Sequence, residues 1–63
     1  MPRKTHSARF KYPPRTVLAE QVTETVARGV AQEQSQANKN RAVEVVSEDG
    51  TVKALYLNGR DVL

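Results

Sequence analysis

Hydrophobic residues recur every four positions in the middle of the chain, and they are Leu18, Val22, Val26 and Val30. This spacing places the four side chains on one face of an α-helix. Thr16 precedes the first of them and suits an N-cap, whereas the polar run over residues 32–40 suits a solvent-exposed helix end. The pattern predicts one amphipathic helix over about residues 16–37, with its apolar stripe packed on a sheet.

The C-terminal third changes to a period of two. Residues 41–47 and 51–57 are rich in β-branched and aliphatic side chains. Asp49-Gly50 lies between them and is a favoured hairpin dipeptide, and Asn58-Gly59 is a second turn signal of the same kind. The pattern predicts a β-hairpin or a three-stranded antiparallel meander over residues 42–63, and the whole chain is therefore expected to be of the α+β class.

A type I′ turn at Asp49-Gly50 would fix the register of this hairpin. The expected pairs are Glu48 with Thr51, Ser47 with Val52, Val45 with Ala54, and Val43 with Tyr56. The face opposite these valines is also apolar, and its members are Ala42, Val46, Leu55 and Leu57. One helix covers only one face, so the other needs a partner chain or the segment Phe10–Tyr12 as a cover. The uncovered apolar face therefore predicts a homodimer or a subunit of a larger complex.

Residues 1–15 have few hydrophobic side chains and contain all three prolines of the chain. The alternation of cation and aromatic over Arg9–Tyr12 predicts a short strand at residues 9–12, and residues 1–7 are expected to be disordered. Pro13-Pro14 favours extended backbone and marks a boundary. The chain therefore divides into a basic, partly disordered arm (1–15) and a small helix-plus-hairpin domain (16–63).

The charge of the chain is distributed unevenly. Its net charge of +3 arises from an arm with five cations and no acid, followed by 48 residues with five cations and seven acids. A cationic segment attached to a mildly acidic domain is typical of proteins that bind a polyanion. The basicity of the whole protein is therefore a property of its first fifteen residues.

The candidate nucleic-acid contacts follow from this asymmetry. The arm's cations suit phosphate contacts, and they are Arg3, Lys4, Arg9, Lys11 and Arg15. Phe10 and Tyr12 have two readings, because an aromatic among cations can stack on bases or anchor the arm to the core. Arg28 and Arg41 are candidates for reading base edges, together with Gln32.

Several classes of function are not supported by the residues. The 63-residue chain has no cysteine and a single histidine, His6, so it lacks the side chains for a thiolate metal site or a histidine cluster. No glycine-rich phosphate motif or cofactor fingerprint is present. No apolar stretch is long enough to span a bilayer, and no secretory signal is visible. We expect a cytoplasmic protein that is not an enzyme, without cofactor, metal, membrane association or small-molecule substrate.

The leading hypothesis is a small regulatory or accessory protein that binds DNA or RNA through its basic arm. The alternative is a protein-interaction module or small inhibitor, which would bind a protein partner through the exposed apolar sheet face or by adding an edge strand. The sequence does not choose between DNA and RNA.

Overall fold

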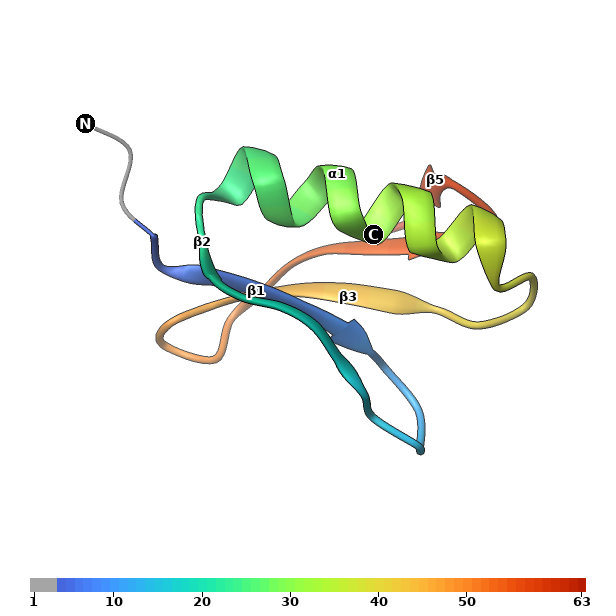
Figure 1. The fold of residues 1–63 in the computed structure, drawn as a ribbon, viewed down its shortest axis with the longest axis horizontal. Helices are drawn as coiled ribbons and strands as arrows, with labels where there is room; N and C mark the ends of the chain where they lie inside the picture. Colours follow the sequence, from blue (N-terminus) through green and yellow to red (C-terminus); the bar gives the residue numbers. More distant parts are fainter. Residues whose placement is uncertain (1–3) are drawn as a thin grey trace.

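The computed structural model describes residues 4–63, which form one helix packed on a five-stranded antiparallel sheet (Figure 1). The elements in chain order are β1 (His6–Phe10), β2 (Val17–Val22), α1 (Glu24–Ala37), β3 (Val43–Ser47), β4 (Val52–Leu57) and β5 (Arg60–Asp61). The strands lie in the order β2-β1-β3-β4-β5, and α1 covers one face of the sheet. The α+β class expected from the sequence is confirmed.

The N-terminal segment is part of the sheet rather than a separate arm. β1 lies between β2 and β3 and pairs antiparallel with both. Its Ala8 and Phe10 are buried, which gives the segment the alternating pattern of an internal strand. The strand expected at 9–12 thus occurs earlier, and the disorder expected for residues 1–7 is wrong for His6 and Ser7. The part of that expectation concerning residues 1–3 lies outside the described residues.

The helix begins eight residues later than the sequence pattern predicts. Residues 17–22 form β2, and Thr23 rather than Thr16 is the N-cap, since its hydroxyl accepts a hydrogen bond from the backbone N–H of Val26 at 3.3 Å. A repeat of four residues keeps side chains on one face of a strand as well as of a helix, because four is a multiple of the strand period of two. The repeat therefore did not distinguish the two structures.

The buried face of α1 also differs from the predicted stripe. Val26 is 49% exposed, whereas Ala27, Ala31 and Ser35 are fully buried. Val30 packs at the edge of the core. The helix ends at Ala37, as expected, but its last turns are not wholly exposed to solvent, because Ser35 is buried against the sheet. Small side chains along this face let the helix backbone approach the strands closely.

The C-terminal hairpin forms with much of the predicted register. Val43 pairs with Tyr56 and Val45 with Ala54, as expected, but a bulge pairs Val52 with Val46 instead of Ser47. Only Gly50 has a positive φ in the first turn, at +88°, and its N–H donates to the Ser47 carbonyl at 3.0 Å. This geometry is a type I turn followed by a left-handed glycine, a longer loop than type I′. Because this loop contains one more residue than a type I′ turn, Val52 pairs one residue earlier on β3, with Val46.

The second turn does have the type I′ form, because Asn58 and Gly59 both have positive φ, +54° and +83°. It connects β4 to the short strand β5, so the predicted third strand is present.

The core lies between α1 and the sheet. Its buried sheet residues are Ala8, Phe10, Val43, Val45, Ala54 and Tyr56. The alternate residues point to the other side, which we call the open face, and they include Ser7, Arg9, Glu44, Val46, Leu55 and Leu57. No element of residues 4–63 covers the open face. Phe10 does not cover it either, since its side chain belongs to the core.

Candidate functional site

The topology brings three connections to the same end of the sheet. β1, α1 and β4 all end there, so the β1–β2 loop (11–16), the α1–β3 loop (38–42) and the β4–β5 turn lie together (Figure 1). Hydrogen bonds join them. The Lys11 N–H donates to the Ala42 carbonyl at 2.9 Å, and the Asn40 N–H donates to Asn58 Oδ1 at 3.3 Å.

Two of these connections carry only positive charge. Loops 11–16 and 38–42 contain four cations and no acid, and the cations are Lys11, Arg15, Lys39 and Arg41. Arg15 and Lys39 are exposed, and Lys11 and Arg41 are half-buried. We call these four residues together with Tyr12 the basic end. The charge there is concentrated because loops far apart in sequence meet.

Arg41 is held at the basic end by two contacts, neither of which is with a carboxylate. Its guanidinium carbon lies 3.6 Å from the centre of the Phe10 ring, and its Nη2 donates to the Pro14 carbonyl at 3.0 Å. Phe10 is only 5% exposed, so the ring is a fixed support. Cation–π contact and a carbonyl orient the guanidinium while leaving its full charge in place.

Tyr12 is the exposed aromatic of the basic end, with 64% of its surface accessible. The ammonium of Lys11 lies 5.7 Å from the centre of its ring. A shallow cleft of about 130 Å³ lies between Tyr12 and Arg41, and its other lining residues are Phe10, Pro13, Asn40 and Ala42. The cleft thus combines a cation, an aromatic ring and an amide in one small space.

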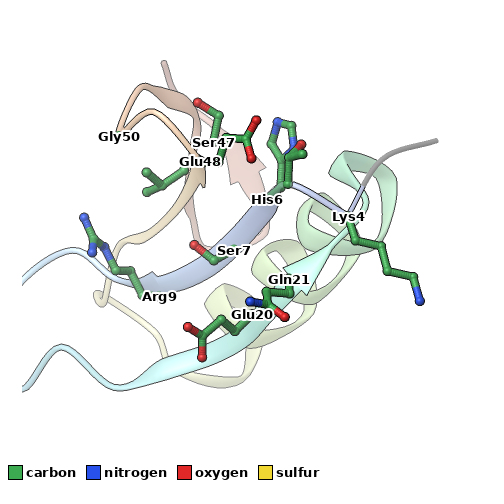
Figure 2. A pocket seen from close by; sticks show the side chains of 11 residues that line it. Lys4, His6, Ser7, Arg9, Glu20, Gln21, Ser47, Glu48 and Gly50 are labelled. Atoms are coloured by element: carbon green, nitrogen blue, oxygen red, sulfur yellow. The ribbon is translucent and has the colours of Figure 1, made fainter.

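The other end of the sheet carries mixed charge. A hollow of about 420 Å³ runs along β1, β2 and the β3–β4 turn, and its lining includes Arg9, Glu20 and Glu48. Figure 2 shows Arg9 and Glu20 on neighbouring strands, with the side chain of Lys4 directed away from them. Both acidic and basic groups therefore line this hollow.

The β3–β4 turn at that end contains a carboxylate, Asp49, that is hydrogen-bonded within the turn. Asp49 accepts hydrogen bonds from the Ser47 hydroxyl and from the Thr51 N–H, and these hold the pKa of Asp49 well below its usual range. The carboxylate is thus a structural acceptor that closes the turn.

Arg9 and Arg28 are paired with acids. Arg9 Nε lies 2.8 Å from Oε1 of Glu44, whose side chain is 8% exposed. Arg28 contacts Glu24 at 2.8 Å and Asp61 at 3.4 Å, and it also donates to the Lys53 carbonyl. The hydrogen bond from Arg28 holds the pKa of Glu24 below its ordinary value of 4.5. Both guanidinium groups therefore stabilise the fold, and their charge is locally compensated.

The structure brings together only part of the predicted set. Lys11, Tyr12, Arg15 and Arg41 gather at the basic end, with Phe10 beneath Arg41 in the core. The other predicted residues lie elsewhere: Lys4 is exposed near the start of β1, and Arg9 and Arg28 are ion-paired. Arg3 lies outside the described residues.

Lys39 was not among the predicted contacts, although it is exposed at the basic end. Its sequence context, a polar run after the hydrophobic helix stripe, indicates only a helix end. The sequence feature that could have indicated Lys39 is the absence of acids across residues 38–42. This feature indicates a binding site only when it is known that the loop lies beside residues 11–16.

Two further findings concern chemistry and membranes. Within residues 4–63, no three His, Asp or Glu side chains are grouped closely enough to hold a metal ion. In the same part of the chain, α1 is too short and too polar to cross a bilayer.

The fold and this site define a small α+β protein, with one helix on an antiparallel sheet and a concentration of unmatched cations at one sheet end. Comparison of the chain with known protein families, with curated proteins and with solved structures finds no match.

Proposed function

We propose that the protein is a small non-enzymatic nucleic-acid-binding protein that contacts phosphates with its basic end. The observation that carries the proposal is the meeting of four cations, without an acid, in loops 11–16 and 38–42. Phosphate contacts of this kind supply most of the affinity of sequence-independent binding. The exposed ring of Tyr12 adds a surface on which a base can stack.

The contrast with the rest of the surface supports this location. Arg9 and Arg28 would have to leave Glu44, Glu24 or Asp61 before contacting a phosphate. Arg15 and Lys39 are exposed and need no such exchange. Binding is therefore assigned to the end of the sheet and not to the whole N-terminal segment.

Salt dependence tests the proposal. Binding to DNA or RNA is expected to weaken as salt rises, with a log–log slope of about −0.7 to −0.9 per neutralised phosphate. A double variant, Arg15→Gln/Lys39→Gln, should weaken binding about tenfold or more near 0.1 M salt. It should also reduce the slope by about 1.4 to 1.8.

A second double variant provides the matched control. Lys4→Gln/Lys53→Gln removes the same net charge from two exposed positions outside the basic end. It should change affinity by less than about threefold, because distant surface charges are screened over roughly 10 Å. Equal losses in the two double variants would overturn the location, and salt-independent binding or none would overturn the function. Deletion of residues 1–15 is unsuitable, since it would remove β1 from within the sheet.

The open face favours a second candidate function, binding of a protein partner. Leu55 and Leu57 are half-buried there, and Val17 at the sheet edge is 52% exposed. A second copy of the chain is the partner to test first, because two-fold pairing with antiparallel strands sets the basic end of one copy near Glu20 and Glu48 of the other.

Light scattering over a range of concentrations tests this candidate. A dimer that a Leu55→Lys variant converts to a monomer would support it, and a monomer at every concentration would exclude it. The buried pair of Glu44 and Arg9 weighs against a dry interface, since covering both charges adds a desolvation cost.

A further inference from the structure

From the cleft at the basic end we infer that the preferred ligand is single-stranded nucleic acid, one unpaired base of which enters between Tyr12 and Arg41. The inference rests on the proposed function and deepens it, because it names the form of nucleic acid and the contact that selects it. Three features of the cleft carry the inference: a supported guanidinium plane, an exposed ring beside prolines, and an amide on the lining.

Arg41 supplies the first feature. A guanidinium is planar and has two faces, and the Phe10 ring lies against one of them at 3.6 Å. The hydrogen bond from Nη2 to the Pro14 carbonyl fixes the orientation of the plane. Arg41 also lines the cleft, so a base that enters it meets a cation already held in place. Unpaired bases stack on such arginine planes as well as on aromatic rings.

Tyr12 and Pro13 supply the second feature. Tyr12 is the most exposed aromatic side chain among the described residues, and it lines the same cleft. The prolines that follow it restrict the backbone of the loop, so little conformational entropy is lost when a ligand binds against it. A ring held on a restricted loop is a suitable second stacking surface.

Asn40 supplies the third feature, because it lines the cleft and its side-chain amide carries both hydrogen-bond donors and an acceptor. Its backbone is fixed in the left-handed region, with φ +66°, and its N–H donates to Asn58. The amide can therefore meet the edge of a base that stacks on Arg41.

The size and make-up of the site favour a single strand over a duplex. A cleft of 130 Å³ has the volume of about four water molecules, which is room for one small planar group. The elements that read the major groove of a duplex are a helix or a two-stranded ribbon. The basic end consists of loops, and Arg28 on the helix is paired with carboxylates. Lys11, Arg15 and Lys39 around the cleft suit the phosphates on either side of a splayed base.

Three DNA probes of equal length test the inference: a mixed-sequence single strand, its duplex, and a single strand with abasic sites throughout. The single strand should bind roughly 5- to 150-fold more tightly than the abasic strand, which is the range for stacking of one base. It should also bind more tightly than the duplex. In a Tyr56→Phe background, Tyr12 is the sole tyrosine, and its fluorescence should be quenched by the single strand but not by the abasic one.

Two variants separate stacking from charge. Arg41→Lys keeps the charge and removes the plane, and Tyr12→Leu removes the ring from an exposed position where folding is not at risk. Each should reduce the preference for the single strand over the abasic strand by fivefold or more, whereas Tyr12→Phe should retain it.

The outcomes distinguish this inference from the proposed function. Equal affinity for the single and abasic strands, with the Arg15→Gln/Lys39→Gln loss intact, overturns the unpaired-base site and leaves phosphate binding standing. Tighter binding to the duplex also overturns the inference. A protein that binds none of these probes and none of the corresponding RNA strands overturns both.

Discussion

Arg41, in the loop before β3, and Arg9, in β1, satisfy their guanidinium groups in opposite ways. Arg41 rests on the Phe10 ring and donates to a backbone carbonyl, whereas Arg9 forms an ion pair with the buried Glu44. The first arrangement fixes a cation and keeps its charge available to a ligand. The second uses the charge to compensate a carboxylate within the fold. The contacts of each cation, rather than the number of cations in a segment, therefore indicate where a polyanion can bind.

The largest effect is expected where a cation compensates a buried acid. Arg9→Leu leaves the Glu44 carboxylate without its ion pair and should lower the free energy of unfolding by about 2 to 3 kcal/mol. This is less than the loss for a fully buried pair, because the Arg9 side chain is 39% exposed. Urea denaturation measures the change.

Arg15→Gln is the matched change at the basic end, and it should alter the stability by less than about 0.5 kcal/mol. The double variant Arg9→Leu/Glu44→Leu should recover most of the loss, since it removes both charges together. If Arg9→Leu and Arg15→Gln had the same effect on stability, the contrast between the two arginine sites would not hold.

The parts of the fold that depend on local signals were predictable from the sequence. Asp49-Gly50 and Asn58-Gly59 locate the C-terminal turns, and the strands on either side are contiguous with them. The pairing of β1 with β2 was missed, because Pro13-Pro14 indicates a boundary but does not show that the chain reverses there. The period of four in residues 18–30 fits both strand and helix, so the start of α1 could not be resolved.

The candidate site was predictable only in part, for a related reason. The availability of a cation depends on acids that are distant in sequence: Arg9 meets Glu44 35 residues away, and Arg28 meets Asp61 33 residues away. Loops 11–16 and 38–42 are likewise distant in sequence and come together only in the folded protein. A sequence shows how many charges a segment has, but the tertiary fold decides which of them are compensated.

The next largest effect on stability is expected at Ser35, because its hydroxyl hydrogen-bonds the β4–β5 turn, beside the basic end, to the helix. Its buried hydroxyl accepts from the Gly59 N–H at 2.8 Å and donates to the Gln32 carbonyl at 2.9 Å. Ser35→Ala leaves the Gly59 N–H unpaired in the interior and should cost about 1 to 2 kcal/mol of stability. Hydrogen exchange at Gly59 should accelerate as well.

Ser7→Ala, at a half-buried position of the open face, is the control and should have a smaller effect on stability. Since Ser35 does not line the cleft between Tyr12 and Arg41, Ser35→Ala should retain nucleic-acid affinity under conditions where the protein is folded. If Ser35→Ala changed neither the stability nor the hydrogen exchange at Gly59, the hydrogen bond from Gly59 to Ser35 would not stabilise the fold.

A substitution at Gly29 is expected to raise the stability, by less than the preceding variants lower it. Gly29 lies in the middle of α1 on the side that faces solvent, and a Cβ there would meet no atom within 4 Å. Gly29→Ala should therefore raise the free energy of unfolding by about 0.5 to 1 kcal/mol. Gly50→Ala is the contrasting control and should destabilise by about 1 kcal/mol, because φ there is +88°. Thermal melts and binding titrations of Gly29→Ala should show higher stability with unchanged affinity, which would separate stability from binding.

The smallest effect is expected at the exposed pair of Glu24 and Arg28. The pKa of Glu24 is lowered in the folded state by its hydrogen bond from Arg28, so the ionised carboxylate contributes stability above its ordinary pKa of 4.5. This contribution is lost as the pH falls through the lower, folded-state pKa. Glu24→Gln should thus be less stable than the parent protein at pH 7, and the difference should shrink as the pH falls below 4.5, as measured by urea denaturation across that range. The Arg15→Gln/Lys39→Gln variant has lost no partner of Glu24 and should follow the pH dependence of the parent in this window. A difference between Glu24→Gln and the parent that did not diminish with acid would show that Glu24 acts through packing rather than through its charge, and Asp61 would then be the acid that compensates Arg28.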